Sequence, residues 1–335
     1  MKKLLQFSAI LLMCLLALSA CQGKGWPSRT ITIVVSSGAG GGTDLGNRAI
    51  GAAMEGILGA KISVVNNNAG GGGAAADQVF SAKHDGYMWL GFFEGIFSNA
   101  PMGAHPGTSK DWDYFLLGGT PGLMSVAENS RFKSAADVID AMKKDPGNIR
   151  LACSSTGTIW DIKSTLLAEA AGVEYKYMPY QGSNPSILAL IAGEVDVIIT
   201  GLGEQVEFLE ARKITPIAMI ELYGMKVPGF DNEIPSVCDA APEMKKFLPI
   251  NQTIGFAIPA DTPADVKNKI SDAFAKAMET PTIKDYCNVK FVAPSGARGT
   301  EAKDIAKKME STLGWILFDK GVAPTSPEKF GIPRP

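Results

Sequence analysis

The sequence predicts an α/β protein made of two similar halves, each with parallel strands. In the first half, a β-branched strand at 30–35 leads through a Gly-rich loop into a helix at 45–58 and a strand at 61–65. The second half begins with a strand at 148–153, followed by a Ser/Thr-rich loop and a helix at 159–171. Strands that alternate with helices across short loops form parallel βαβ units. A chain of 335 residues is long enough for two such domains.

Shorter apolar segments supply the remaining strands and one more helix. The first half continues with a helix at 74–82 and a strand at 87–92. Strands at 175–178 and 195–200 extend the second half, and a strand at 256–259 precedes the C-terminal helices. These strands are rich in the β-branched and aromatic residues that favour strands.

Polar residues before prolines indicate where several helices begin. Asn184-Pro185, Thr262-Pro263 and Thr280-Pro281 each predict a capping side chain followed by a proline at the first helical position. Thr300 is predicted to cap a last helix that ends near Lys320. The Pro-rich segment 324–335 is expected to lie on the surface with little regular structure.

The N-terminus has the pattern of a secretory signal. Lys2 and Lys3 precede an apolar run at 9–18 and then small residues, which predicts a signal peptide at 1–20. As a helix the run would be about 15 Å long, half the roughly 30 Å of a bilayer core. The residues up to Cys21 are similar to the bacterial lipobox, so we expect Cys21 to be lipidated, with a tether at 21–25 and the protein anchored outside the cytoplasm. The alternative is an ordinary cleaved signal with an incidental cysteine.

Composition and absent motifs argue against several functional classes. Lys and Arg total 32 against 34 Asp and Glu, a net charge of −2, so nucleic-acid binding is not expected. The GxGxxG, P-loop, GxSxG and HExxH motifs are absent, and His84 and His105 are expected in surface or structural positions. We expect no catalytic residues, no cofactor and no metal ion. Cys153, Cys238 and Cys287 lack CxxC spacing and are expected to be buried, with at most one disulfide.

Two Ser/Thr/Gly loops, each between a strand and a helix, are the strongest functional signal. Small residues let a ligand approach the backbone, and the first amides of a helix favour an anion. A carboxylate or phosphate can therefore bind there without Lys or Arg. In each loop alone, a tight connection with capping residues is the alternative. Their presence in both halves favours a binding cleft between two lobes. Hydroxyl donors are available from Ser36, Ser37, Thr43, Ser154, Ser155, Thr156 and Thr158.

Acidic and aromatic residues beside these loops allow two interpretations each. Asp44 is predicted to interact with the first amides of its own helix rather than with a ligand. Glu94 would face either the cleft or a solvated rim. Phe93, Trp160 and Tyr180 would pack either on a ligand or in the core.

An ordered set of motifs runs along nearly the whole chain after residue 25. They occupy 26–32, 39–44 (followed by Arg48), 66–73, 85–87, 179–185, 193–196 and 256–263. In this order the motifs resemble the tripartite tricarboxylate transporter solute receptors, also called the Bug family. The chain departs from the family pattern at Ala39, where proline is usual, at Asn68-Ala69, where Arg-Pro is usual, and at Asp161, where histidine is frequent.

The resemblance implies a two-lobed type II periplasmic binding protein fold that closes on its ligand like a Venus flytrap. Lobe 1 would comprise 26–122 and 253–335, including the C-terminal tail, and lobe 2 would comprise 123–252. The implied function is capture of a small organic carboxylate for a membrane permease of the same transporter type, by a monomeric receptor. The alternatives are presentation of the closed form to a sensor kinase and an extracytoplasmic enzyme.

The ligand site implied by the resemblance and the loops draws on both lobes. Lobe 1 would contribute Ser37, Gly38, Ala39, Gly40, Gly41, Thr43, Asp44, Gly71, Gly72, Phe93 and Glu94. Lobe 2 would contribute Ser155, Thr156, Gly157, Thr158, Tyr180, Gln181, Gly182 and Thr200.

Overall fold

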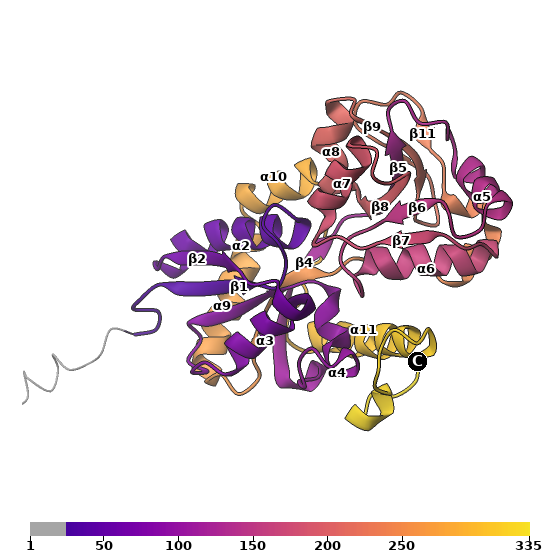
Figure 1. The fold of residues 1–335 in the computed structure, drawn as a ribbon. Coiled ribbons are helices and arrows are strands. Elements are labelled where there is room, and N and C mark those ends of the chain that lie inside the picture. Colours follow the sequence, from indigo (N-terminus) through magenta and orange to yellow (C-terminus); the bar gives the residue numbers. More distant parts are fainter. Residues whose placement is uncertain (1–24) are drawn as a thin grey trace, which may run out of the picture.

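Two β-sheets, one in each lobe, organise the computed structural model, which describes residues 25–335 (Figure 1). The predicted signal peptide and Cys21 lie outside the described residues. One sheet has six strands in the order β13-β4-β12-β3-β1-β2, and the other has five in the order β7-β6-β8-β5-β9. The predicted α/β class with two lobes is confirmed.

The six-stranded sheet begins with the βαβ units that the sequence predicts. Strand β1 pairs in parallel with β2 on one side and with β3 on the other. Helix α2 connects β1 to β2, and a 3-10 turn followed by α3 connects β2 to β3. The bounds are β1 Ile31–Val35, α2 Gly42–Leu58, β2 Ile62–Asn66, the turn Ala69–Gly72, α3 Gly73–Phe80 and β3 Met88–Phe92.

Apolar side chains of β1 point to both faces of this sheet, which explains why helices cover both faces. Ile31, Ile33 and Val35 belong to the apolar cluster beneath α2 and α9, whereas Val34 faces the cluster beneath α3 and α11. A strand buried on both faces is largely apolar, and in β1 every residue except the half-buried Thr32 is apolar and buried. The sheet therefore holds the loop after Val35 firmly at its carboxyl edge.

The chain leaves this sheet through β4 and returns to it through β12. Strand β12 lies between β3 and β4 and is antiparallel to both. The connections after β3 contain 3-10 turns at Glu94–Ser98 and Ser109–Asp111 and the short α4. The bounds are α4 Asn99–Met102, β4 Trp112–Gly119, β12 Ile254–Pro259, α9 Ala264–Met278, α10 Pro281–Val289, β13 Ala293–Pro294 and α11 Gly299–Asp319.

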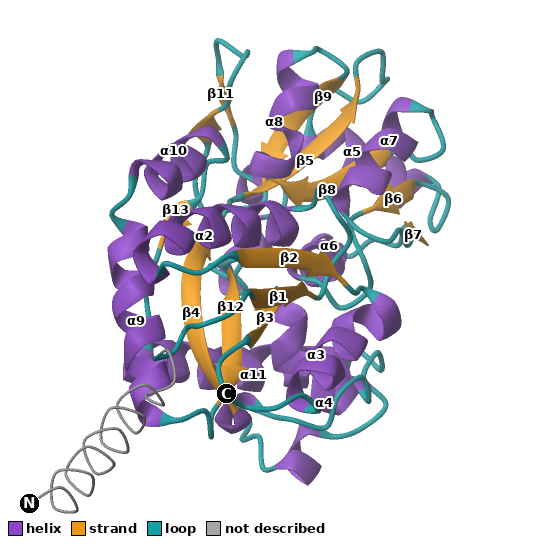
Figure 2. Cartoon of the chain, turned by 90° about the vertical axis from the view of Figure 1, so that its left-hand side faces the viewer, coloured by secondary structure: helices purple, strands orange, loops and turns teal. Residues whose placement is uncertain are grey.

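The five-stranded sheet repeats the parallel unit and adds antiparallel strands (Figure 2). Strand β6 is parallel to β7 and β8, and β5 is antiparallel to β8 and β9. A small hairpin of β10 and β11 and two 3-10 turns, Val237–Asp239 and Pro242–Lys246, follow. The bounds are β5 Gly122–Ala127, α5 Ala135–Lys144, β6 Arg150–Ala152, α6 Ile159–Ala171, β7 Lys176–Met178, α7 Ser183–Ile191, β8 Val197–Gly201, α8 Leu202–Glu210, β9 Ile214–Met219, β10 Met225–Lys226 and β11 Glu233–Ile234.

Three of the four predicted helix starts need correction. Thr280 caps α10 as predicted, but α7 begins at Ser183 with Gly182 as its N-cap. Pro185 is then the third helical residue, which is tolerated because the first-turn amides have no intrahelical acceptor. Helix α9 follows Pro263 as N-cap, and α11 follows Arg298, so Thr262 and Thr300 do not cap.

The C-terminal tail packs against α11, and the three described cysteines are buried. The tail forms one 3-10 turn, Pro327–Phe330, and Pro333 accepts hydrogen bonds from Ser311 and Trp315 of α11. Cys153, Cys238 and Cys287 are buried and free. Within residues 25–335, no helix has the length and apolar character that a membrane crossing needs.

Candidate functional site

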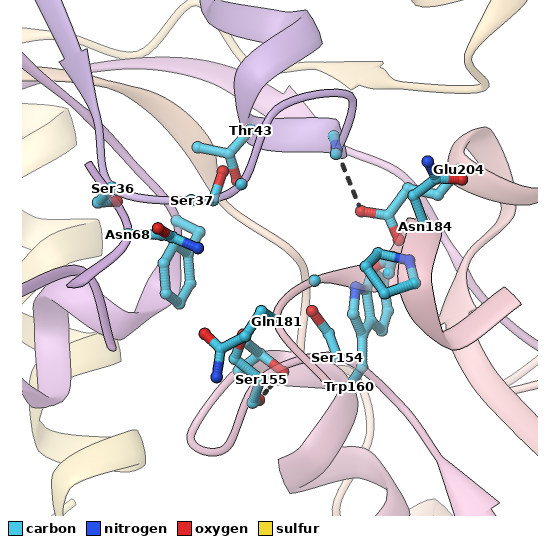
Figure 3. A pocket seen from close by; sticks show the side chains of 18 of the residues that line it. Ser36, Ser37, Thr43, Asn68, Ser154, Ser155, Trp160, Gln181, Asn184 and Glu204 are labelled. Carbon is cyan, nitrogen blue, oxygen red and sulfur yellow. Dashed lines mark hydrogen bonds between the residues drawn. The ribbon is translucent and has the colours of Figure 1, made fainter. Parts of the chain in front are cut away.

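A cavity of about 290 Å³ lies between the two lobes (Figure 3). Twelve residues expected at the ligand site line it: Ser37, Gly38, Ala39, Gly41, Thr43, Gly71, Phe93, Glu94, Ser155, Thr158, Gln181 and Gly182. The other lining residues are Ser36, Gly42, Asn68, Ser154, Trp160, Ser183, Asn184, Pro185, Glu204 and Gln252. None of these described lining residues is Lys, Arg or His.

The loop between β1 and α2 forms one wall and leaves the helix N-terminus open. Gly40, with φ of 80°, adopts the left-handed conformation, and its amide donates to Asp44 Oδ2 at 2.9 Å. The N-cap residue is Gly41, which is extended and has no side chain to cap α2. The first-turn amides of α2 therefore lack a capping group from their own loop. Next to them, the buried Ser37 hydroxyl has no hydrogen-bond partner.

Asp44 does not line the cavity, but the predicted contact with the first amides of α2 is wrong, because the amide that Asp44 accepts from, that of Gly40, precedes the N-cap Gly41. Its carboxylate accepts hydrogen bonds from Gly40, from Arg48 Nε at 3.1 Å and from Asn66 Nδ2 at 2.9 Å. Burial alone would raise the pKa of Asp44, but the hydrogen bonds from Arg48, Gly40 and Asn66 outweigh it, so the pKa is lowered. Asp44 therefore stabilises the loop and does not line the cavity.

The loop between β6 and α6 has the same backbone but a closed helix N-terminus. Gly157, with φ of 79°, donates its amide to Asp161 Oδ2 at 2.8 Å. The N-cap residue is Thr158, whose hydroxyl accepts from the Asp161 amide and donates to Ser155 O. Burial raises the pKa of Asp161, and the Gly157 amide only partly offsets this effect. The N-cap of this helix thus supplies an acceptor for one first-turn amide, that of Asp161, at 3.5 Å.

The start of α7 supplies a second open helix end, which the sequence analysis did not single out. Its N-cap is Gly182, with φ of 122° and no side-chain cap, and Ser183 and Asn184 follow it along the cavity wall. Because this N-terminus carries the positive end of a helix dipole, it attracts an anion from lobe 2.

Two carboxyl groups line the cavity from opposite lobes. Glu94 is 1% exposed and accepts a hydrogen bond from the Thr253 amide. Glu204 belongs to α8: it accepts from the Gly201 amide at 2.9 Å and, across the lobes, from the Gly42 amide at 3.3 Å. Burial raises the pKa of Glu94 to about 8 and also raises the pKa of Glu204. Glu94 therefore faces the cavity rather than a solvated rim.

Seven residues expected at the site do not line the cavity. Gly40, Asp44 and Gly157 shape the loops, and Gly72 lets Ser36 O come within 2.7 Å of where a Cβ would lie. The Thr156 hydroxyl lies 3.2 Å from the Tyr177 hydroxyl. The Tyr180 hydroxyl donates to Glu194 instead of reaching a ligand, and the fully buried Thr200 accepts from Gln205. Local sequence could not reveal these side-chain directions.

Sequence reasoning missed Glu204 and Gln252, both of which link the lobes. Gln252 Oε1 accepts from the Thr120 amide at 3.0 Å, so it joins the two crossing segments beside the cavity. Glu204 and Gly42 are separated by 162 residues along the chain. The acid at the third position of α8 was the available signal for Glu204, because it predicts a helix-capping carboxylate.

The two lobes are in contact around the cavity. Besides the Gly42–Glu204 hydrogen bond, Lys290, the residue that follows α10, forms an ion pair with Glu207 of α8 at 2.8 Å. A Cβ on Gly38 would lie 3.1 Å from the carbonyl oxygen of Gln181, so the two loops nearly touch.

The histidines lie away from the cavity lining. His84 Nδ1 is 2.5 Å from Asp261, and the buried His105 Nδ1 is 2.6 Å from Asp77. Among residues 25–335, no three His, Cys, Asp or Glu side chains gather into a group that could hold a metal ion.

Residues 47–312 match the model of the tripartite tricarboxylate transporter family receptor. The chain belongs to this family. The receptor is 28% identical over 289 residues to the UPF0065 protein in the tcbD-tcbE intergenic region of Pseudomonas sp. strain P51, covering 84% of this chain and 83% of the relative. Family membership makes the protein a solute receptor, as the motif order indicated.

Solved structures show the same fold for this receptor. The periplasmic binding protein BugD is 24% identical, with a TM-score of 0.77 over 89% of this chain and 99% of BugD. An R. palustris protein with adipate has 22% identity and a TM-score of 0.80, with 89% and 99% covered. MatC from Rhodopseudomonas palustris with bound malate has 22% identity and a TM-score of 0.76, with 87% and 100% covered. The two-lobed fold of periplasmic binding proteins is thereby confirmed.

Proposed function

We propose that this receptor binds a small organic carboxylate in the cavity between its lobes and delivers it to a permease of the tripartite tricarboxylate type. The observation that carries the proposal is the N-terminus of α2, where Glu204 takes the Gly42 amide but no described side chain caps the Thr43 and Asp44 amides. The unpartnered Ser37 hydroxyl lies on the same wall. The open N-terminus of α7 lines the same cavity from the other lobe. Helix ends of this kind bind anions without a basic side chain.

The chemistry of the walls suits one carboxylate of a small molecule. The second and third amides of α2 have no intrahelical acceptor, and the hydroxyls of Ser36, Thr43, Ser154 and Ser155 lie along the same walls. Hydrogen bonds to a charged acceptor are stronger than those to a neutral one, and lobe closure removes competing water. The adipate and malate of two structural neighbours belong to the same chemical class.

The remaining parts of the proposal concern the lobes and the cell. We assign 26–122 with 253–335 to lobe 1 and 123–252 to lobe 2, supported by the strand membership of the two sheets. Gly122, the first residue of β5, lies at this division. The protein would act as a monomer outside the cytoplasmic membrane, held there by a lipid on Cys21.

Ligand-dependent thermal unfolding tests the binding proposal. The purified chain is heated with each member of a panel of organic acids and with the neutral amide of each acid as its matched control. An acid at 100 times its dissociation constant should add about 2.7 kcal/mol to the free energy of unfolding, while its amide adds little. If no acid raises the melting temperature, or if amides raise it equally, carboxylate binding is refuted.

Cell fractionation and uptake test the remaining claims. Cys21→Ser should release the protein from the membrane fraction, whereas Cys238→Ser, at a buried cysteine in lobe 2, should leave it there. Deleting the receptor gene should abolish uptake of the identified acid. Normal uptake without the receptor would refute delivery to a permease.

A further inference from the structure

The ionisable side chains among the described residues that line the cavity are all acidic. Glu94 and Glu204 line the cavity, and none of its described lining residues is Lys, Arg or His. Buried carboxyl groups in proteins are usually paired with a cation, because burying an unpaired charge costs free energy. A receptor for an acid would be expected to avoid negative groups, so their presence needs a reason.

Neither carboxyl group has a cationic partner in the protein. Glu94 receives the Thr253 amide, and Glu204 receives the amides of Gly201 and Gly42. Lys163 is the nearby base, but its Nζ donates to Ile220 O at 3.1 Å and to Glu221 Oε1 at 2.6 Å. Lys163 therefore forms its ion pair with Glu221 and not with Glu94.

The positions of the donors and acids divide the cavity. Figure 3 shows Ser36, Ser37 and Asn68 on one side of the space and Glu204 on the other. The donors on the first side suit a carboxylate. A second negative group near Glu204 would be repelled, whereas a positive group would be attracted.

We infer that the ligand carries a cationic amine in addition to its carboxylate, and that Glu94 and Glu204 hold this amine. This inference rests on the proposed function, which supplies the carboxylate. An ammonium has three donors and no acceptor, so it suits a cavity whose ionisable lining groups, Glu94 and Glu204, are both acidic. The favoured substrate class is a small amino acid or a related amino-carboxylic acid rather than a dicarboxylate.

Proton release provides a signature of this binding mode. Burial raises the pKa of Glu94 and the hydrogen bond from the Thr253 amide lowers it, while the charges of Glu204 and Lys163 have smaller, opposite effects. Because the pKa is about 8, Glu94 is mostly protonated near neutral pH and must lose its proton when it pairs with an ammonium. A dicarboxylate would not draw the proton from Glu94 and would bring a second negative group toward Glu204.

Calorimetry with matched probe sets tests the inference. Each set has one carbon skeleton and three end groups: butanoate, succinate and 4-aminobutanoate; hexanoate, adipate and 6-aminohexanoate; benzoate, terephthalate and 4-(aminomethyl)benzoate. In the set whose carbon skeleton fits the cavity, the amino acid should bind at least about tenfold more tightly than the plain acid. The dicarboxylate should bind no more tightly than the plain acid. Titrations in buffers of different ionisation enthalpy should show protons released on amine binding.

Variants assign the effect to the two carboxyl groups. Glu94→Gln keeps an oxygen acceptor for the Thr253 amide, and Glu204→Gln keeps one for either the Gly201 or the Gly42 amide. Each variant should reduce the amine preference to about threefold or less. Affinity for the plain acid should change little. Glu94→Gln should also abolish proton release. Glu210→Gln, an exposed acid on the same helix as Glu204 and outside the cavity, is the matched control and should retain the preference.

The outcomes separate the inference from the function on which it rests. If plain acids or dicarboxylates bind while the amine gains nothing, the inference is wrong and carboxylate binding stands. If the amine preference survives in both variants, Glu94 and Glu204 do not hold the amine. If no acid in any set binds, the proposed function fails together with the inference.

Discussion

The loop before α2 and the loop before α6 have the same backbone and differ at the N-cap. Gly40 and Gly157 have φ values of 80° and 79°, and each donates its amide to an aspartate four residues later. The N-caps, Gly41 and Thr158, have nearly equal angles, with φ of −78° and −74°. Thr158 caps its helix, whereas Gly41 has no side chain and leaves α2 open. Both loops line the cavity, and one side chain decides whether the helix is capped from its own loop.

The two aspartates differ in a second respect. Asp44 pairs with Arg48 at 3.0 Å, while the one hydrogen bond that opposes burial at Asp161 comes from the Gly157 amide. The pKa of Asp44 is lowered and that of Asp161 is raised. The open loop is therefore held by a charged network, and the closed loop by its own helix cap.

Replacing each aspartate with asparagine should give the largest difference in stability between the two loops. Asp44→Asn loses hydrogen bonds to a charged acceptor and should reduce the free energy of unfolding by about 2 kcal/mol near neutral pH. Because the pKa of Asp44 is lowered in the fold, its contribution is present above its ordinary pKa and lost in acid. The deficit should therefore shrink as the pH falls. Urea unfolding at several pH values measures it.

Asp161→Asn is the matched partner of that experiment. Because its pKa is raised in the fold, the contribution of Asp161 is complete in acid and declines as the pH rises through the folded pKa. Asparagine resembles the protonated form, so the loss should stay below about 1 kcal/mol. Equal losses in the two variants would contradict the assigned electrostatic difference.

The shared backbone predicts equal effects at the two left-handed glycines. Gly40→Ala and Gly157→Ala should each cost about 1.5 kcal/mol of stability, because a Cβ disfavours this conformation. A Cβ would meet nothing within 4 Å at either position, so the cost is conformational rather than steric. Thermal unfolding of both variants checks this. A large inequality would show that the two loops are not equivalent.

Gly41→Thr should convert the open loop into a copy of the closed one. The new hydroxyl would accept the Asp44 amide, as Thr158 accepts the Asp161 amide, and would compete with the ligand. Affinity for the carboxylate should fall at least tenfold, about 1.4 kcal/mol, while the melting temperature does not fall. Gly56→Ala, at an exposed position of α2, is the control for helix stabilisation alone. Unchanged affinity in calorimetry would rule out α2 as the anion site.

The smallest effect on ligand affinity is expected at Thr158, the N-cap of α6. Thr158→Ala should reduce stability by about 1 kcal/mol through loss of the N-cap. Ligand affinity should change less than about threefold, because the Thr158 hydroxyl is already bonded within its loop. Thr280→Ala, which removes the cap of α10 far from the cavity, serves as the comparison. A loss of affinity much larger than the loss of stability would mean that Thr158 contacts the ligand.

Local patterns predicted most of the fold and the loop half of the site. The βαβ order, α6 from Ile159 to Ala171 and the Thr280 cap follow from short-range periodicity and capping preferences. Helix starts were misplaced where a glycine could serve as N-cap, as at Gly182. The directions of Thr156, Tyr180 and Thr200 depend on partners in other elements.

The sequence alone determined that two glycine loops end strands and begin helices, because these features depend on neighbours along the chain. The N-cap residues Gly41 and Thr158 also stand in the sequence, but tertiary structure decided which groups of the other lobe meet these loops. Only the packed lobes bring Glu204 to the Gly42 amide, 162 residues away, and place Glu94 beside Thr253. Contacts at such separations arise from closure of the whole chain, which no local preference encodes.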